Sequence, residues 1–201
     1  NIIPFLSSST DVLVHTWNDR DNLRWVTKLN RYKKYCNNLN VVVEKPIYTK
    51  KLWSYFYSTW KAYSLIEKSE NYEYIVKFKP NIDTEEIPSS FNLESYFEKA
   101  FLQSRPLLSK YTAKDCIYGL IYYKTLDERI FSGYPKAFDK LFKMSYEEMK
   151  QAMIDLDSSL QIQYGDNYEG SIFWTTWAAE RKVPIIQDLN LILTNNKVYG
   201  K

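Results

Sequence analysis

Two oxygen-bearing side chains, Asn81 and Asp83, follow an apolar segment that ends at Pro80. Because residues i and i+2 of an extended chain point the same way, the amide of Asn81 and the carboxylate of Asp83 can face a common point. Oxygen ligands of this kind suit Mn²⁺ or Mg²⁺, which usually complete their shell with substrate phosphates. The pair therefore predicts a metal site, although Pro-Asn also starts turns and Asp83 could equally cap a helical turn.

Further residues that could bind a ligand lie on the first apolar run and on a later helix. His15 and Trp17 lie at the carboxyl end of that run, where parallel sheets meet their ligands. Trp17 could stack on a base, whereas His15 could equally be a packed and hydrogen-bonded residue. Ser58 and Lys61 lie on the amphipathic helix that precedes the metal segment. Lys61 could reach a phosphate as a point charge, or it could be a solvated helix lysine.

Two carboxylates, Asp127 and Glu169, are candidates for stabilising charge at a reacting carbon. Asp127 follows the fourth predicted strand, and Glu169 lies near the start of a predicted helix. Each could be an acid at the mouth of a cleft, and each could equally be a cap or a surface charge. Asp166 is well placed to act as the N-cap of that helix.

The composition excludes several classes of protein. Only 5 of the 201 residues are Gly, and their spacing matches neither the dinucleotide-binding pattern GxGxxG nor the phosphate-binding loop. His15 is the single histidine, which excludes zinc sites of the HExxH type. Any phosphate must therefore be held by a metal on oxygen ligands and by Lys or Tyr side chains.

Charge and cysteine content indicate the setting of the protein. The net charge of +3 is far from the footprint of a nucleic-acid-binding protein, so no nucleic acid partner is expected. No apolar run approaches the roughly 18 residues of a membrane span. Cys36 and Cys116 form no CxxC pair and no disulfide framework, and no local motif supports a thiol nucleophile paired with His15. These features predict a reducing, cytoplasmic location.

Apolar periodicity predicts an α/β protein with a mainly parallel central sheet flanked by helices. Strands are expected over residues 11–17, 41–43, 72–78, 116–123 and 183–193, with a brief one at 130–131. Helices are expected over residues 23–35, 49–66, 92–103, 135–142, 145–155 and 168–182. Phe173, Trp174 and Trp177 recur at helical spacing and are expected in the core. Residues 1–201 are interpreted as one domain, and the start at Asn1 would also suit a fragment of a longer multidomain protein.

Four segments resemble motifs of viral and bacterial glycosyltransferases, chlorella-virus enzymes among them. Residues 11–17 (DVLVHTW) are similar to their strand D-V-F-x-H-T-W, and residues 57–65 to their helix S-x-x-K-A-x-x-L. Residues 74–83 (YIVKFKPNID) are similar to the strand Y-x-x-V-I-R-x-R-P-D-x-D, which ends in the metal-binding DxD motif. Residues 127–133 resemble a D-x-x-F-x-G segment. The resemblance implies a single-domain GT-A fold, the fold of nucleotide-diphospho-sugar transferases.

The resemblance also implies an activity, namely metal-dependent transfer of a hexose or deoxyhexose from a UDP-sugar to a glycan or glycoprotein acceptor. Asn81 and Asp83 would then hold Mn²⁺ or Mg²⁺, although Asn81 replaces the first acid of the DxD motif. The donor would be bound by His15, Trp17, Ser58, Lys61 and Lys79, and Asp127 and Glu169 would be catalytic. A non-catalytic carbohydrate- or protein-binding module is the alternative, because aromatic residues reach 17% and the first acid is missing.

Overall fold

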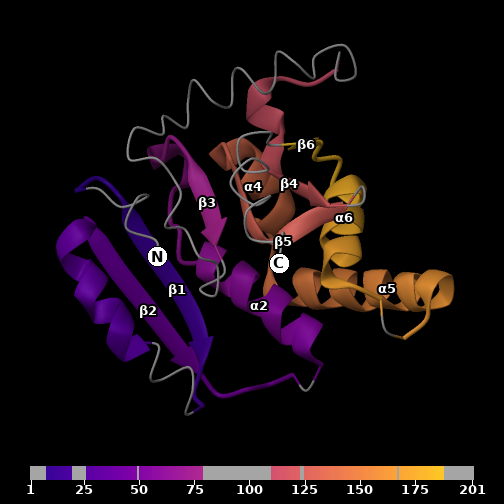
Figure 1. The fold of residues 1–201 in the computed structure, drawn as a ribbon, viewed down its shortest axis with the longest axis horizontal. Coiled ribbons are helices and arrows are strands. Elements are labelled where there is room, and N and C mark those ends of the chain that lie inside the picture. Colours follow the sequence, from indigo (N-terminus) through magenta and orange to yellow (C-terminus); the bar gives the residue numbers. More distant parts are fainter. Residues whose placement is uncertain are drawn as a thin grey trace, which may run out of the picture. The chain divides into compact units, whose positions relative to one another are not determined.

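A computed structural model describes residues 8–19, 26–48, 50–78, 110–122, 125–166 and 168–187 (Figure 1). The chain is a mixed α/β protein, and its contacts divide it into two compact units, Asn1–Glu67 and Lys68–Lys201. This division by contacts does not test the expectation of a single domain, which stays a prediction. The helix expected over residues 92–103 lies outside the described residues, as do Lys79, Asn81 and Asp83.

The first unit is built on two parallel strands. Strand β1 (Asp11–Trp17) pairs with β2 (Asn38–Glu44) along their full lengths, from Asp11 opposite Asn38 to Trp17 opposite Glu44. Between them the chain is helical over residues 26–29 and continues as the 3-10 helix η2 (Asn30–Tyr35). The predicted strands over 11–17 and 41–43 are confirmed, together with the helical crossover that a parallel pair requires.

Helix α2 (Lys51–Tyr63) covers one face of this pair and packs against β1. Its buried residues are Phe56, Tyr57, Trp60 and Tyr63, spaced so that they form one apolar stripe. The helix expected over 49–66 is thus confirmed with slightly shorter bounds. The stripe leaves the neighbouring positions Ser58 and Lys61 half-buried beside the carboxyl ends of the strands.

The second unit contains a sheet whose described strands have the order β3-β5-β4-β6. They are β3 (Ile75–Phe78), β4 (Ile117–Tyr122), β5 (Thr125–Gly133) and β6 (Ile185–Gln187). β5 is antiparallel to β3 and β4, and only the β4–β6 pair is parallel. The expectation of a mainly parallel sheet is therefore wrong for these strands. Two residues separate β4 from β5, which suffices for a hairpin but not for a crossover.

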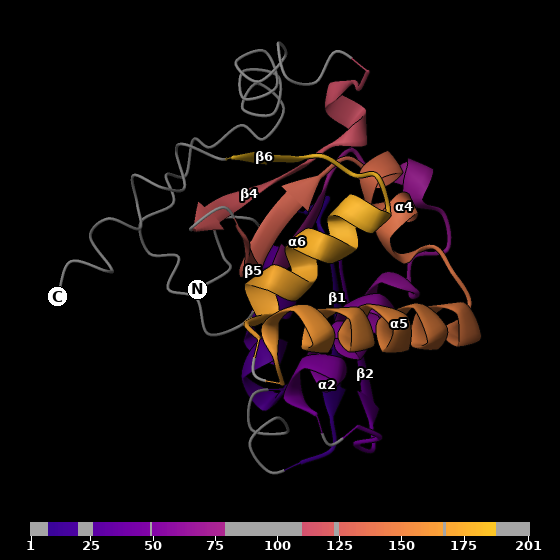
Figure 2. The same ribbon diagram turned by 90° about the vertical axis from the view of Figure 1, so that its right-hand side faces the viewer.

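Helices cover this sheet and form its core. They are α4 (Pro135–Phe142), α5 (Tyr146–Tyr164) and α6 (Gly170–Glu180), preceded by the 3-10 turns η3 (Ser69–Asn71) and η5 (Ala113–Asp115). Figure 2 shows α6 against β5, with α5 beneath it. Phe173, Trp174 and Trp177 are almost fully buried, which confirms the predicted core stripe of α6.

The ends of α5 show one correct and one wrong prediction. Ser145 and Glu148 form a capping box at its start, which agrees with the predicted start at residue 145. The helix then runs nine residues beyond the predicted end at residue 155 and stops at Gly165, whose φ of 80° few other residues adopt. Asp166 belongs to the turn after this stop, so it does not cap α6, whose N-cap position is Glu169.

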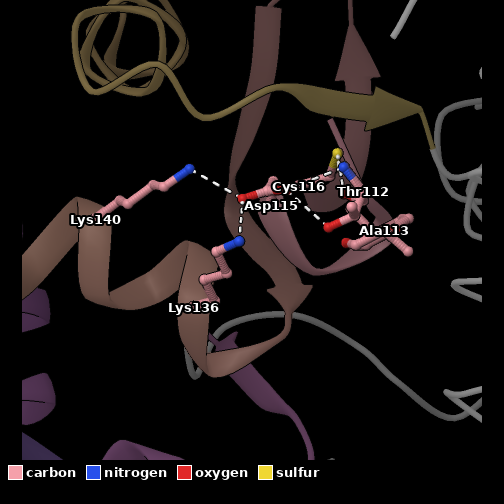
Figure 3. A network of polar contacts seen from close by, with 7 residues as sticks. Thr112, Ala113, Asp115, Cys116, Lys136 and Lys140 are labelled. Atoms are coloured by element: carbon pink, nitrogen blue, oxygen red, sulfur yellow. Dashed lines mark hydrogen bonds and ion pairs between the residues drawn. The ribbon is translucent and has the colours of Figure 1, made fainter. Parts of the chain in front are cut away.

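A buried carboxylate joins two parts of the second unit (Figure 3). Asp115 accepts hydrogen bonds from the backbone and hydroxyl of Thr112 at 3.0 and 2.7 Å and pairs with Lys136 and Lys140 of α4 at 3.0 and 3.1 Å. Burial alone would raise the pKa of Asp115, but these donors and ammonium groups hold it well below its usual range. Asp115 therefore fixes α4 beside the turn that leads into β4.

The Asp115→Asn variant is expected to unfold more easily than the wild type. At pH 7 the loss is roughly 1–3 kcal/mol, because hydrogen bonds to a charged group and two ion pairs are weakened. The depressed pKa means that the stability from Asp115 is present above about pH 4 and is lost as the pH falls through the folded-state value. Urea unfolding at pH 7 and pH 3 checks both points. The exposed Asp166→Asn variant is the control, and equal stability of the two variants would contradict the prediction.

Gly133→Ala is expected to destabilise the sheet of the second unit. Gly133 lies in β5 opposite both Ile75 and Ile117, and an added Cβ would come within 2.9 Å of the backbone carbonyl oxygen of Cys116. A backbone atom in a paired strand cannot move aside easily, so the cost is about 1–3 kcal/mol, the usual range for overpacking. Thermal unfolding measures it, and an unchanged melting temperature would show that the strands accommodate the methyl group.

Candidate functional site

The candidate site lies at the carboxyl ends of β1 and β2. His15 and Trp17 are two residues apart in β1, so their side chains point to the same face. Glu44 is the last residue of β2 and lies directly opposite Trp17. Tyr57 and Lys61 lie one turn apart on α2, with Ser58 beside them. We call Glu44, His15, Tyr57, Ser58 and Lys61 the Glu44 cluster. The structure thus brings together four of the five residues predicted to bind the donor, namely His15, Trp17, Ser58 and Lys61.

Glu44 is the centre of the cluster because three donors surround its carboxylate. The Tyr57 hydroxyl donates to Oε2 at 2.9 Å, and Nε2 of His15 lies 3.2 Å from the same atom. Nζ of Lys61 lies 3.1 Å from Oε1. Burial raises the pKa of Glu44, but the hydrogen bonds from Tyr57 and Lys61 outweigh burial, and the net shift is downward. Glu44 is therefore ionised at neutral pH.

His15 is enclosed by the cluster. Its side chain has no exposed surface, and its ring makes edge contacts with Trp17 and Tyr57 at centroid distances of 4.8 and 5.4 Å. Burial lowers the pKa of His15, and this effect exceeds the opposing hydrogen bond and charge of Glu44. Its second nitrogen, Nδ1, lies 3.1 Å from Oγ of Ser58. His15 is therefore neutral at pH 7 and hydrogen-bonded on both sides, as the packed alternative expected.

The aromatic residues limit how Trp17 can meet a ligand. Its ring is stacked on Tyr57 at 5.4 Å with an interplanar angle of 22°. Tyr57 in turn contacts Tyr48 and Trp60, each at a centroid distance of 5.6 Å. One face of Trp17 is thus covered, so a base could stack only on the other face.

Lys61 is not the solvated helix lysine of one alternative, and its reach to a phosphate stays a prediction. Its ammonium group is paired with Glu44 and not merely solvated, and 28% of the side chain remains exposed. Because Glu44 is negative and His15 is neutral, the Glu44 cluster carries no net charge. Binding a diphosphate here would require Lys61 to exchange partners or further positive charge to arrive.

The other residues predicted for the site lie outside the described residues or in the second unit. Lys79, Asn81 and Asp83 lie outside the described residues, although β3 ends at Phe78, directly before Lys79. Asp127 lies within β5. Glu169 is exposed at the start of α6, and its Oε2 accepts a hydrogen bond from Ser171 at 3.3 Å. This contact with Ser171 is that of a carboxylate at a helix end.

Glu44 and Tyr57 are not among the site residues predicted from the sequence. The signal for Glu44 was available, because it directly follows Val41, Val42 and Val43 and so occupies a strand end like that of Trp17. Tyr57 belongs to the apolar stripe of α2 and carried no mark that distinguished it from a core residue. Its role depends on which strand end it faces, which local spacing does not reveal.

The thiols and the described carboxylates carry no sign of metal or thiolate chemistry. Cys36 and Cys116 are both free, and burial raises the pKa of Cys116 to about 12, so that it is not a thiolate at neutral pH. Within the described ranges, no three His, Cys, Asp or Glu side chains gather as a metal-binding group.

No helix in the described part of the chain is both long and apolar enough to span a membrane.

Comparisons with models of protein families, with curated proteins and with solved structures found no match to this chain. The interpretation of the site rests on its own side chains and on the four motif segments in the sequence.

Acidification is expected to destabilise the protein through His15. Because the folded-state pKa is below the ordinary 6.5, the unfolded chain binds a proton first, so stability is fully present above about pH 6.5 and falls as the pH approaches the folded-state value. Urea unfolding at pH 7 and pH 5.5 should show a larger loss for the wild type than for His15→Gln. Glu44 adds its own loss only at lower pH. An identical loss in both proteins would refute this role of His15.

Proposed function

We propose that this protein is a glycosyltransferase of the GT-A type that moves a sugar from a UDP-sugar to a glycan or glycoprotein acceptor. The observation that supports the proposal is the convergence of two motif segments that lie 40 residues apart in the chain. Residues 11–17 and 57–65 resemble separate glycosyltransferase motifs, and their polar residues His15 and Ser58 are in hydrogen-bond contact. The meeting point is the carboxyl edge of a parallel strand pair, where nucleotide ligands bind in α/β proteins.

The charge of the Glu44 cluster indicates how a donor would be held. A neutral cluster offers polar contacts to a nucleoside or sugar more readily than it offers charge to a diphosphate. Trp17, which stacks on Tyr57 with one face, would meet a base with the other, and Ser58 and Lys61 of α2 would meet polar groups of the donor. Lys61 would contribute to phosphate binding by leaving Glu44, an exchange between two anionic partners.

The resemblance to the DxD motif assigns the metal of such an enzyme to the segment that follows β3 in the sequence. Lys79 directly follows the end of this strand, and Asn81 and Asp83 offer an amide and a carboxylate oxygen, a donor set that fits Mn²⁺ or Mg²⁺. Such an ion, when bound, supplies Lewis-acid stabilisation of the leaving diphosphate. Asp127 and Glu169 are the proposed carboxylates for the developing oxocarbenium centre.

Calorimetric titration of the full chain with UDP, with and without Mn²⁺, tests the proposal. We expect binding that requires Mn²⁺ and that weakens at least roughly tenfold in Asp83→Ala, since even residues that only support a metal ligand often contribute that much. Asn81→Asp, which restores the second acid of the motif, should bind Mn²⁺ more tightly because it adds a charged ligand. The exposed Asp166→Asn variant is the matched control.

Two outcomes would count against a glycosyltransferase. The first is the absence of UDP binding, and the second is an Asp83→Ala variant that binds UDP and turns over like the wild type. Binding on a glycan array without any dependence on nucleotide would instead favour the non-catalytic carbohydrate-binding module.

A further inference from the structure

The ionised carboxylate of Glu44 determines which nitrogen of His15 carries the proton. A carboxylate without a proton can only accept hydrogen bonds, so the imidazole nitrogen 3.2 Å from Oε2 has to donate. That atom is Nε2. A neutral imidazole holds one proton, and Nδ1 is then left with a lone pair and can only accept.

The lone pair on Nδ1 sets the direction of the next hydrogen bond. Oγ of Ser58 lies 3.1 Å from Nδ1, so the hydroxyl proton of Ser58 points at the ring. The hydroxyl is then unable to donate elsewhere, and its two lone pairs remain as acceptors. The order of donation is Ser58 to His15 and His15 to Glu44.

Among the serine and threonine hydroxyls of α2, Ser58 differs from the other two. A helical Ser or Thr often donates back to a carbonyl oxygen of the preceding turn. Thr59 does so to the carbonyl oxygen of Tyr55 at 3.1 Å, and Ser54 donates to that of Tyr48 at 3.0 Å. Ser58 instead meets the side chain of His15, which lies on β1.

We infer that Ser58 Oγ is a fixed hydrogen-bond acceptor of the donor site and selects ligands that present a hydroxyl group to it. This inference rests on the proposed function, because it identifies the ligand group that the same site recognises. Ser58 is half-buried, its hydroxyl meets His15, and the His15 ring contacts Trp17, the residue proposed to meet the base. Lys61, proposed to meet the phosphates, lies three residues further along α2. Between a base and a diphosphate a nucleotide sugar places the hydroxyls of its ribose, and beyond the diphosphate those of the transferred sugar.

The direction of the relay can be measured without any ligand. Since His15 is the only histidine of the chain, ¹⁵N-histidine labelling places the signals of a single imidazole in the spectrum. At pH 7 we expect the proton on Nε2 in the wild type and in Tyr57→Phe, which keeps the carboxylate. In Glu44→Gln the amide can donate as well as accept, so the proton of His15 should no longer be confined to Nε2. A proton on Nδ1, or on both nitrogens, in the wild type would overturn the inference.

Ligand selection is measured by titrating the full chain with UDP, 2′-deoxy-UDP, 3′-deoxy-UDP and a panel of UDP-hexoses. Ser58→Ala should weaken binding by roughly fivefold, the value of one ordinary hydrogen bond, and Ser58→Thr should restore it. The control on the same helix, Ser54→Ala, should leave the affinity near that of the wild type. The contact belongs to the ribose if Ser58→Ala already binds UDP more weakly, and if the wild type binds one of the deoxy analogues with a similarly reduced affinity. A loss confined to UDP-hexoses assigns it to the transferred sugar.

The outcomes separate this inference from the proposed function. If UDP and UDP-hexoses bind the wild type and Ser58→Ala alike, the selection by Ser58 is refuted while a nucleotide-sugar site remains. If none of these compounds binds, the proposed function and the ligand assignment fail together, and the labelled imidazole still decides the direction of the relay.

Discussion

Glu44, the last residue of β2, has a side chain that is only 31% exposed to solvent. A carboxylate that is partly removed from water needs hydrogen-bond donors around it. Those donors come from two other elements of the first unit. His15 belongs to β1, and Tyr57 and Lys61 present the same face of α2 one turn apart. A rotation of α2 about its axis would remove Tyr57 and Lys61 from the carboxylate, and a shift of β1 along β2 would remove His15. One charge therefore fixes how these elements meet.

The second unit uses a carboxylate in a comparable way but to a different end. Asp115 is surrounded by Thr112, Lys136 and Lys140, so the charge is compensated locally between η5 and α4. Around Glu44 the hydrogen bonds continue through a buried ring to the half-buried hydroxyl of Ser58. This continuation distinguishes a cluster that can meet a ligand from one that secures a fold. The buried Lys77, whose ammonium lies 5.3 and 5.5 Å from the ring centres of Phe131 and Trp174, shows a third way to stabilise charge.

Elements defined by local patterns were predicted well from the sequence. The apolar run over residues 11–17 and the helix over 135–142 have the observed bounds, because alternation and helical periodicity are properties of neighbouring residues. β5 was reduced to residues 130–131 in the prediction because three charged residues, 127–129, interrupt its apolar pattern. With most of that strand missing, its hairpin with β4 could not be foreseen, and the sheet was expected to be mainly parallel.

The candidate site was predicted in part for a related reason. His15, Trp17, Ser58 and Lys61 could be proposed from residue type and from their positions on predicted elements. The carboxylate that organises them also ends a predicted strand, but its position opposite Trp17 follows only from the pairing of β1 with β2. Register is a property of two segments together, so no local pattern encodes it.

The in-register pairing of β1 and β2 also restricts how the chain can change in length during evolution. Inserting or deleting one residue within either strand would turn the side chains beyond that point to the opposite face. His15 and Trp17, or Glu44, would then point away from α2. Length variation in homologues should therefore fall in the crossover between the strands, where added residues leave both ends of the pair in place. The two seven-residue strands, by contrast, should keep their length wherever the cluster is kept.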